Sequence, residues 1–210
     1  MLRVGLTGSF ASGKSAVGEM LAARGAHVIQ ADRIAHELMQ PGEPVYAEVV
    51  RHFGRQILEA DGRINRKKLA EAAFGAGQAA ASSRIAELNR IVHPAVIAHQ
   101  EKWMEETGHR HPNAIAVVEA ALIDEAGVAN HFDKLIVVTC PPEIRLQRLA
   151  ARSGMDRANA QREMNRRMAA QLPDEQKAKA GDYIIDNSGS LADTEAQVDK
   201  IFKELQGLAC

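Results

Sequence analysis

The residues best suited to chemistry stand near the start of the chain, in the run Gly8–Ser15, which reads Gly-Ser-Phe-Ala-Ser-Gly-Lys-Ser. In this Gly-x4-Gly-Lys-Ser pattern, consecutive backbone N–H groups surround phosphate oxygens, and the glycines allow the close approach that this needs. Lys14 would bridge the β- and γ-phosphates of a nucleoside triphosphate, and the Ser15 hydroxyl would ligate Mg²⁺. The expected nucleotide-binding residues are Gly8, Ala11, Ser12, Gly13, Lys14, Ser15 and Ala16.

A carboxylate that could act on an acceptor follows the second expected strand. Phosphorylation of a hydroxyl group calls for a carboxylate that orients it and takes its proton. Asp32 stands just past Gln30, at the strand end where open α/β sheets bind ligands. The alternative is a helix N-cap, a position that aspartate favours. Beside a phosphate-binding loop the catalytic interpretation is favoured, and Asp32 could fill both roles.

The elements that must position these residues alternate between strands and helices. Short apolar runs, rich in Val and Ile and without strict alternation, predict buried parallel strands at Leu2–Thr7, Ala26–Gln30, Ala114–Val118, Lys134–Thr139 and Tyr183–Asp186. Because helical stretches separate these runs, we predict a doubly wound α/β fold with a five-stranded parallel sheet.

Two insertions interrupt this alternation. Between Gln30 and Asn113 the connection is far longer than a crossover needs. One helix, Lys14–Arg24, is expected before this insertion. Within the insertion the expected helices are Asp32–Met39, Val45–Phe53, Arg66–Phe74, Ser82–Val92 and Ala95–Thr107. The second insertion, 153–173, carries several arginines and suits a mobile lid. We therefore predict a core of residues 1–30, 113–152 and 174–210, an acceptor lobe of 31–112, and a lid of 153–173.

Composition excludes several other classes of protein. The chain has 210 residues, 46% hydrophobic and 25% charged, with a net charge of −1, so disorder and a general attraction to nucleic acid or anionic lipid are not expected. No segment approaches the length of a membrane span, and no signal peptide is expected. Cys140 and Cys210 have no metal-ligand or redox spacing, which suits a reducing cytoplasm. The expected oligomeric state is a monomer or a small homo-oligomer.

The reaction class follows from what accompanies the loop. A GTPase needs an Asn-Lys-x-Asp element, which the sequence lacks, and the Asp-x-x-Gly match at Asp124–Gly127 stands without its partners. A large ATPase would need further domains. A small phosphotransferase, with a core, an acceptor lobe and an arginine-bearing lid, is the class that remains.

At this level of detail the sequence resembles the dephospho-CoA kinase family. The resemblance is carried by Leu6–Ser15, Gln30–Ala35, Pro41-Gly42, Phe53-Gly54, Asp61-Gly62, Arg66, Leu69, Phe74, Leu88–Pro94, Leu122-Ile123, Glu125, Arg148-Leu149, Arg152, Arg167, Gln171, Asp182 and Asn187. It therefore spans nearly the whole chain, and the Ala31-Asp32 and His93-Pro94 segments are its most particular parts.

The resemblance implies transfer of the γ-phosphoryl group of ATP to the ribose 3′-hydroxyl of dephospho-CoA, the final step of coenzyme A synthesis. Asp32 would then be the base, and the helical lobe would hold the acceptor. His93 and Pro94 would help to shape the acceptor pocket. The alternative for His93 is an ordinary histidine at a helix end before proline.

The resemblance also implies roles for polar residues in the second half of the chain. Arg148 and Arg152 are one helical turn apart, and such a pair would lie over the nucleotide, one at the adenine and one near the phosphates. Arg167 would descend from the lid to the transferring group. A solvated helix face explains Arg157 and Arg162 equally well. Asn187 would border the adenine, with a polar turn residue as its alternative.

The sequence departs from the family pattern after the third strand. Residues Glu119–Glu125 read Glu-Ala-Ala-Leu-Ile-Asp-Glu, where the family usually has aspartate and then Pro-Leu-Leu-Phe-Glu. Ala121 replaces the proline and Asp124 the aromatic residue, which changes the wall of the acceptor pocket. Glu119 could serve on the metal side, through water, because Mg²⁺ keeps several waters. Ser153 in place of aspartate and Ala11 in place of a loop glycine are the other departures.

Two alternatives to this function stay open at the level of the sequence. One is a small-molecule kinase with a different hydroxyl acceptor, such as a sugar or a nucleoside. The other is a nucleotide-binding regulator without catalysis. The long helical insertion favours a bulky acceptor over a small sugar, and Asp32 with the arginines disfavours the regulator.

Overall fold

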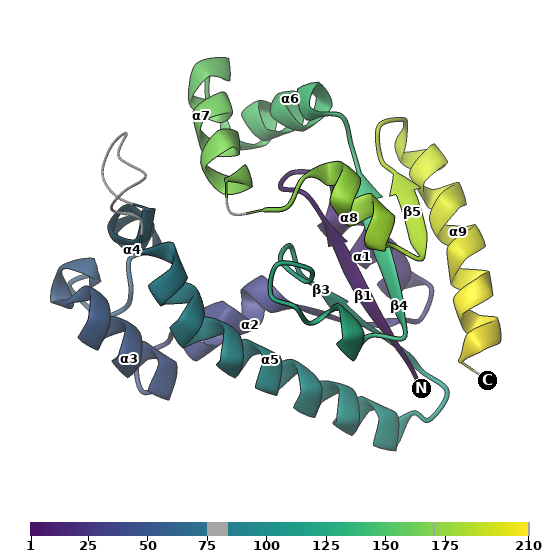
Figure 1. The fold of residues 1–210 in the computed structure, drawn as a ribbon, viewed down its shortest axis with the longest axis horizontal. Helices are drawn as coiled ribbons and strands as arrows, with labels where there is room; N and C mark the ends of the chain where they lie inside the picture. Colours follow the sequence, from purple (N-terminus) through teal and green to yellow (C-terminus); the bar gives the residue numbers. More distant parts are fainter. Residues whose placement is uncertain (75–83, 170, 210) are drawn as a thin grey trace. The chain divides into compact units, whose positions relative to one another are not determined.

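A computed structural model describes residues 1–74, 84–169 and 171–209 (Figure 1). Cys210, the alanine-rich run Gln78–Ala81 and the expected helix start at Ser82 lie outside these residues. The chain divides into two compact units. The first contains Met1–Gln30 and Met104–Cys210, and the second is Ala31–Trp103.

The strands are β1 (Leu2–Gly8), β2 (His27–Gln30), β3 (Ile115–Glu119), β4 (Lys134–Thr139) and β5 (Tyr183–Asp186). The helices are α1 (Lys14–Ala23), α2 (Ala31–Leu38), α3 (Pro44–Phe53), α4 (Arg66–Phe74), α5 (Ile85–Arg110), α6 (Pro142–Ser153), α7 (Arg157–Met168), α8 (Asp174–Ala180) and α9 (Leu191–Leu208), with short 3-10 turns η1 (Arg55–Ile57) and η3 (Ala129–His131). Each expected strand is found, within one residue at either end.

The first unit is built on a five-stranded sheet in the order β2-β3-β1-β4-β5, and every pair of strands is parallel. The predicted doubly wound α/β fold is therefore confirmed. Because β1 is the central strand, the loop that follows it opens at the middle of the carboxyl edge. There Glu119 is in register with both Leu6 and Gln30, so the ends of β1, β2 and β3 meet. Open α/β sheets bind ligands at this edge.

Helices α1 and α9 cover one face of this sheet and explain why its strands are so apolar. Leu6, Val117 and Ile136 from three neighbouring strands pack with Val17 of α1 and Leu205 of α9, and all of them are fully buried. A strand covered on both faces needs continuous apolar residues rather than alternation. This core fixes the positions of the strand ends that carry the polar residues.

The lid region has a buried face of its own. Leu146 and Leu149 of α6 pack with Ala160 and Met164 of α7. Asp156 caps α7, because its carboxylate accepts the Asn159 N–H at 2.8 Å. The weakly amphipathic sequence of α7 thus conceals a small apolar contact with α6.

Helix α5, which begins in the second unit and ends in the first, corrects one expectation. Two helices were expected on either side of His93-Pro94, whereas α5 runs unbroken from Ile85 to Arg110 with Pro94 inside it. Proline removes one helical hydrogen bond and crowds the preceding turn, which usually ends a helix. Here Val92 and Val96, four residues apart on one face, are both buried. Their burial favours continuation of the helix and offsets the local cost of the proline.

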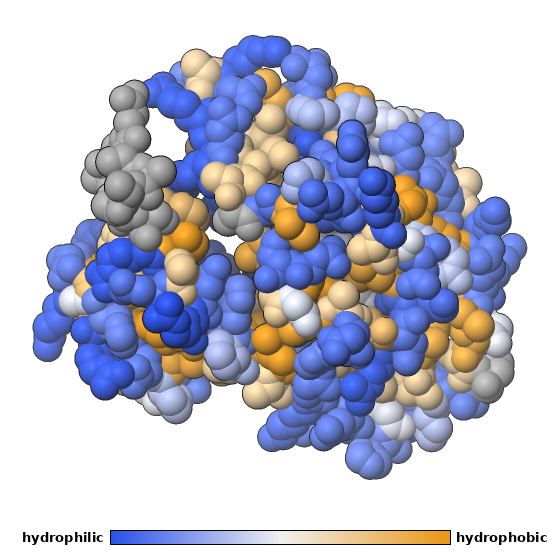
Figure 2. Space-filling view, viewed as in Figure 1, coloured by the Kyte–Doolittle hydropathy of each residue, from blue (hydrophilic) through white to orange (hydrophobic). Residues whose placement is uncertain are grey.

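Hydrophilic side chains predominate on the face drawn in Figure 2. The large hydrophobic residues that are exposed are Met155, Ile184, Leu191 and Leu208. Among the described residues, none of the helices has the length and apolarity needed to cross a lipid bilayer.

Candidate active site

The loop Gly8–Ser15 joins β1 to α1 with the backbone geometry that its glycines suggest. Gly8 has φ +146° and Gly13 has φ +96°. A Cβ at Gly8 would lie 2.3 Å from the Val138 carbonyl oxygen, and one at Gly13 would lie 2.0 Å from Asn187 Nδ2. Both glycines are therefore required by conformation and by space.

Ala11 shares this left-handed geometry. Its φ is +62°, and among the described residues it alone has a positive φ without being glycine. It occupies the place where the family pattern has glycine, so the backbone keeps the glycine conformation despite the side chain. The methyl group and the neighbouring Phe10 pack against the α6–α7 cluster, which compensates for the strain.

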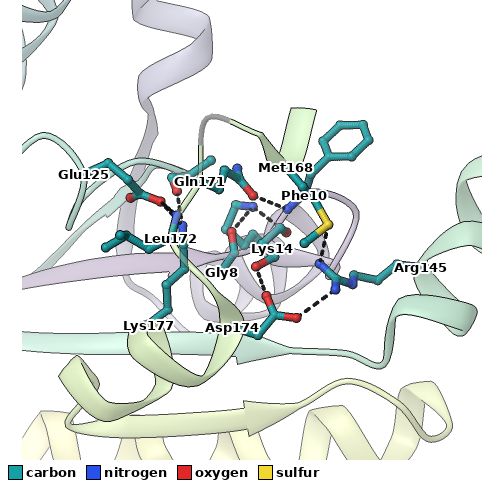
Figure 3. A network of polar contacts seen from close by, with 12 residues as sticks. Gly8, Phe10, Lys14, Glu125, Arg145, Met168, Gln171, Leu172, Asp174 and Lys177 are labelled. Atoms are coloured by element: carbon teal, nitrogen blue, oxygen red, sulfur yellow. Dashed lines mark hydrogen bonds and ion pairs between the residues drawn. The ribbon is translucent and has the colours of Figure 1, made fainter. Parts of the chain in front are cut away.

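The Lys14 ammonium lies across the loop to which it belongs. Its Nζ donates to the Gly8 carbonyl at 2.7 Å and to the Ser9 carbonyl at 3.2 Å (Figure 3). The Ser9 carbonyl also accepts the Ser12 N–H at 3.1 Å. The carbonyls of the loop are thus turned toward the lysine, which leaves the opposite side of the peptide units for N–H groups.

At the strand edge, Ser15 and Glu119 lie together. The Ser15 hydroxyl, on the exposed side of α1, donates to Glu119 Oε1 at 2.7 Å, and Gln30 Nε2 donates to Oε2 at 3.0 Å. Glu119 is buried, with 8% of its surface exposed. A hydroxyl beside an oriented carboxylate is the oxygen donor set that suits Mg²⁺. No group of three or more His, Cys, Asp or Glu ligands occurs among the described residues.

Asn187 ties the loop to the far side of the sheet. Its Nδ2 donates to the Ser12 carbonyl at 2.8 Å, and its Oδ1 accepts the Thr194 hydroxyl at 2.9 Å. The Asn187 carbonyl accepts Arg148 Nη1 at 2.7 Å. Asn187 and Thr194 are both buried. Sequence reasoning missed Thr194, because a threonine in the first turn of a helix gives no sign of its distant partner.

The other expected arginines lie on α6 and α7. Arg167 is exposed, pairs with Glu163 at 2.9 Å and lies over the Phe10 ring, 5.5 Å from its centroid. Arg152 is exposed at the end of α6 and makes no hydrogen bond or ion pair with another described residue. The structure thus brings Arg167 to the loop at Phe10, and Arg148 to Asn187, which itself contacts Ser12 of the loop.

Sequence reasoning missed a polar network beneath the lid, built on the buried side chain of Arg145 (Figure 3). Arg145, which is fully buried, donates to Asp174 Oδ2 at 2.7 Å, and the other oxygen of Asp174 accepts the Ser9 hydroxyl. Gln171 Oε1 accepts the Phe10 N–H at 2.9 Å. Gln171 and Asp174, the first residue of α8, thereby hold the loop at two successive residues. The sequence offers one signal: Arg145 stands four residues before the buried Leu149 and therefore lies on the apolar face of α6.

Another ion pair, with a buried lysine, anchors the same segment. Lys177, 1% exposed, donates to Glu125 Oε1 at 2.8 Å and to the Ala121 carbonyl at 2.6 Å. Glu125 Oε1 also accepts the Leu172 N–H at 2.7 Å. Asp124 Oδ2 is buried without a hydrogen-bond partner. Burial, and then the neighbouring Glu125 charge, raise the pKa of the Asp124 carboxyl above its usual value.

The remaining expected residues belong to the second unit. Asp32 is exposed in the first turn of α2, which begins at Ala31, so Asp32 does not stand in the N-cap position. Its charge is still favourable at a helix N-terminus. His93 lies half-buried within α5, and burial lowers its pKa below the usual value. Pro94 is the exposed residue that follows.

A parallel sheet of this order, with a Gly-x4-Gly-Lys-Ser loop between its central strand and α1 and a Ser15–Glu119 pair at its carboxyl edge, defines a P-loop kinase. The family model for dephospho-CoA kinase matches residues 2–193. The chain belongs to the dephospho-CoA kinase family.

Individual relatives agree with this family. The dephospho-CoA kinase of Aquifex aeolicus is 40% identical over 205 residues, which cover 98% of each chain. Among solved structures, TT1252 from Thermus thermophilus has a TM-score of 0.75 and 29% identity over 97% of each chain. Dephospho-CoA kinase from Campylobacter jejuni has a TM-score of 0.68 and 26% identity, covering 99% of this chain and 98% of its own.

Proposed function

We propose that this chain transfers the γ-phosphoryl group of ATP to the ribose 3′-hydroxyl of dephospho-CoA, with the site residues assigned below. Membership of the family supports ATP-dependent phosphorylation of dephospho-CoA, the reaction that yields coenzyme A. The observation that carries the proposal is the family match over residues 2–193 together with the loop Gly8–Ser15 at the centre of the sheet edge.

The loop binds the triphosphate of ATP. Lys14 exchanges the Gly8 and Ser9 carbonyls for β- and γ-phosphate oxygens, a favourable exchange because phosphate carries full negative charge. Gly13, Ser15 and Ala16, at the start of α1, present N–H groups to the same anion with the help of the helix dipole.

Ser15 and Glu119 hold Mg²⁺. With the ion present, the Ser15 hydroxyl would be its protein ligand, and Glu119, which accepts that hydroxyl, would orient it. When bound, the ion neutralises charge on the phosphates during transfer. Gln30 keeps Glu119 in place through its hydrogen bond to Oε2.

Asp32 acts as the base. It stands two residues after Gln30, the last residue of β2, which is in register with Glu119. Asp32 therefore follows the carboxyl end of a strand that borders the Glu119 strand. Asp32 orients the acceptor hydroxyl and takes its proton as the oxygen attacks the γ-phosphorus. The lobe that follows, with His93 and Pro94, recognises the rest of dephospho-CoA. A neutral His93, which its lowered pKa favours, can donate or accept a hydrogen bond there.

The arginines complete the nucleotide side. Arg148, fixed by the Asn187 carbonyl, borders the adenine with Asn187 itself. Arg152 and Arg167 act on the phosphates, where cationic donors stabilise the charge that spreads in the transition state. Arg167 is released for this purpose from Glu163, a partly exposed pair that costs little to break.

A phosphoryl-transfer assay with matched acceptors tests the proposal. The wild-type chain, ATP and Mg²⁺ are combined with dephospho-CoA, its 3′-deoxy and 2′-deoxy analogues, adenosine and a hexose, and ADP release is followed. We expect turnover with dephospho-CoA and the 2′-deoxy analogue only, and a product that is 80 Da heavier by mass spectrometry. Comparable turnover with the 3′-deoxy analogue would contradict the site of transfer. We also propose that the enzyme acts in the cytoplasm as a monomer or small homo-oligomer.

A further inference from the structure

We infer that Asp174 is a positioning residue of the phosphate-binding loop, set in place by the buried Arg145, and that this pair tunes the affinity for ATP. The inference rests on the proposed function, because it assigns the loop to ATP. Neither residue is assigned above to contact with a substrate, so both act through Ser9.

The contacts form a continuous path from α6 to the loop. Arg145 is fully buried and donates to Asp174 Oδ2 at 2.7 Å. The other oxygen of Asp174 accepts the hydroxyl of Ser9, itself only 4% exposed. The Ser9 carbonyl in turn accepts the Lys14 ammonium and the Ser12 N–H. Any displacement of Asp174 is thus passed to Ser9 and, through its carbonyl, to the loop backbone at Ser12.

Arg145 determines where Asp174 can be. One Nη donates to Asp174, the other lies 3.6 Å from Met168 Sδ, and Nε has no hydrogen-bond partner among the described residues. A buried guanidinium with so few acceptors depends on its carboxylate, because an unpaired buried charge is very costly. Asp174, whose side chain is 36% exposed, is therefore held toward Arg145 by the need of the buried guanidinium for its carboxylate.

Two further contacts, made by residues just before Asp174 in the chain, strengthen this restraint. Gln171 accepts the Phe10 N–H, one residue along the loop from Ser9. Behind the segment, Glu125 accepts the Leu172 N–H and pairs with the buried Lys177. The stretch 171–174 is thus fixed on both sides, so it restrains the loop and does not merely follow it (Figure 3).

Two changes separate positioning from stability. Ser9→Ala removes only the hydroxyl that Asp174 accepts. Arg145→Met with Asp174→Ala removes the ion pair. Met fills the buried space of the guanidinium, an exchange that is often neutral for stability, and Ala leaves only a methyl group at the partly exposed position of Asp174. We expect each change to raise the KM for ATP about tenfold, the loss of one charge-assisted hydrogen bond, and to leave the KM for dephospho-CoA unchanged. The triple variant, which combines all three changes, should have a KM for ATP no higher than the higher of these two values, since all three changes remove the same contact.

Arg157→Met is the matched control. Arg157 also joins α7 to α6, through an exposed ion pair with Glu143 at 2.5 Å, but does not reach the loop. Its KM for ATP should equal that of the wild type. An unchanged KM for ATP in Ser9→Ala, or changes that multiply in the triple variant, would overturn the inference.

Amide hydrogen exchange gives a readout independent of turnover and of the triple variant. In the ATP-free protein, peptides covering residues 9–14 should exchange faster in Ser9→Ala than in the wild type or in Arg157→Met, because Ser12 loses a fixed acceptor. Equal protection in all three would also overturn the inference. Failure of the proposed function shows itself differently, as absence of turnover by the wild type with dephospho-CoA while the exchange difference persists.

Discussion

The Ser15 hydroxyl donates to Glu119 Oε1 at 2.7 Å, which joins the first turn of α1 to the carboxyl end of β3. The two residues are 104 positions apart in the sequence. Their contact places an oxygen donor pair beside the phosphate-binding loop, and it orients a carboxylate that is otherwise buried among strands.

Glu119→Gln tests the metal role of this pair. Glutamine keeps the acceptor for Ser15 but loses the charge that attracts Mg²⁺. The Mg²⁺ concentration that gives half-maximal turnover should rise by about 10–100-fold, the usual effect of a residue that supports a metal ligand. Titration of Mg²⁺ at saturating ATP measures it, and an unchanged requirement would remove Glu119 from the metal site.

Lys14→Ala should lower turnover by about 10²–10³-fold, because one cationic donor to the transferring phosphate is lost. The fold should survive, because Lys14 is only partly buried and its Nζ donates to carbonyls of its own loop. Steady-state kinetics and a thermal melt check the two statements. Near wild-type turnover by a folded variant would contradict the assignment of the loop.

Asp32→Asn should reduce kcat by about 10²–10⁴-fold, the usual contribution of a general base, and leave ATP binding intact. Asparagine retains the size and the side-chain oxygen but cannot take the proton. The loss of charge in the first turn of α2 costs at most about 1 kcal/mol. Asp32→Ala serves as the comparison, and normal kcat in the Asn variant would show that Asp32 is no base.

Arg167→Ala and Arg152→Ala should each lower kcat by about 10²-fold and change the KM for dephospho-CoA little, because their charges matter most in the transition state. Arg162→Ala is the matched control, since Arg162 is exposed on the same helix and donates to Asn159 at 2.8 Å. A rise in KM for dephospho-CoA at constant kcat would instead place the arginine in the acceptor pocket.

Asp124→Asn should stabilise the protein at pH 7. Because burial and Glu125 raise the pKa of Asp124 in the fold above 3.8, the native state binds this proton more tightly than the unfolded chain. The wild type therefore loses stability as pH rises from 3.8 through the folded pKa. Solvent screening of this partly buried group limits the rise in Tm to about 2–4 °C. Melts at pH 3.5 and pH 7 measure it, and an equal Tm difference at both pH values would refute the cause.

Local sequence was sufficient for the strands and for the loop. Five apolar runs predicted β1 to β5 because a strand covered on both faces needs continuous apolar residues, a property of each segment alone. The loop was equally readable, because its function resides in the backbone of eight consecutive residues, Gly8–Ser15. The family resemblance rested on the same short segments, and the comparison over residues 2–193 confirmed it.

Pro94 marks the limit of local reasoning about helices. Proline normally ends a helix, and the sequence on either side was interpreted accordingly. The helix α5 continues through Pro94 because Val92 and Val96 are buried. Their burial depends on residues that are distant in the sequence, so the local sequence does not reveal it.

The contacts that position the loop were decided only by the tertiary structure. Asn187 meets Ser12 across 175 residues, and Asp174 meets Ser9 across 165. Such pairs are selected by the strand order β2-β3-β1-β4-β5, which brings the ends of distant segments to one edge. The local sequence does not distinguish Arg145 from an exposed arginine of a helix. Its charge is tolerated inside the protein only because folding brings the Asp174 carboxylate to it, and that partner is distant in the sequence.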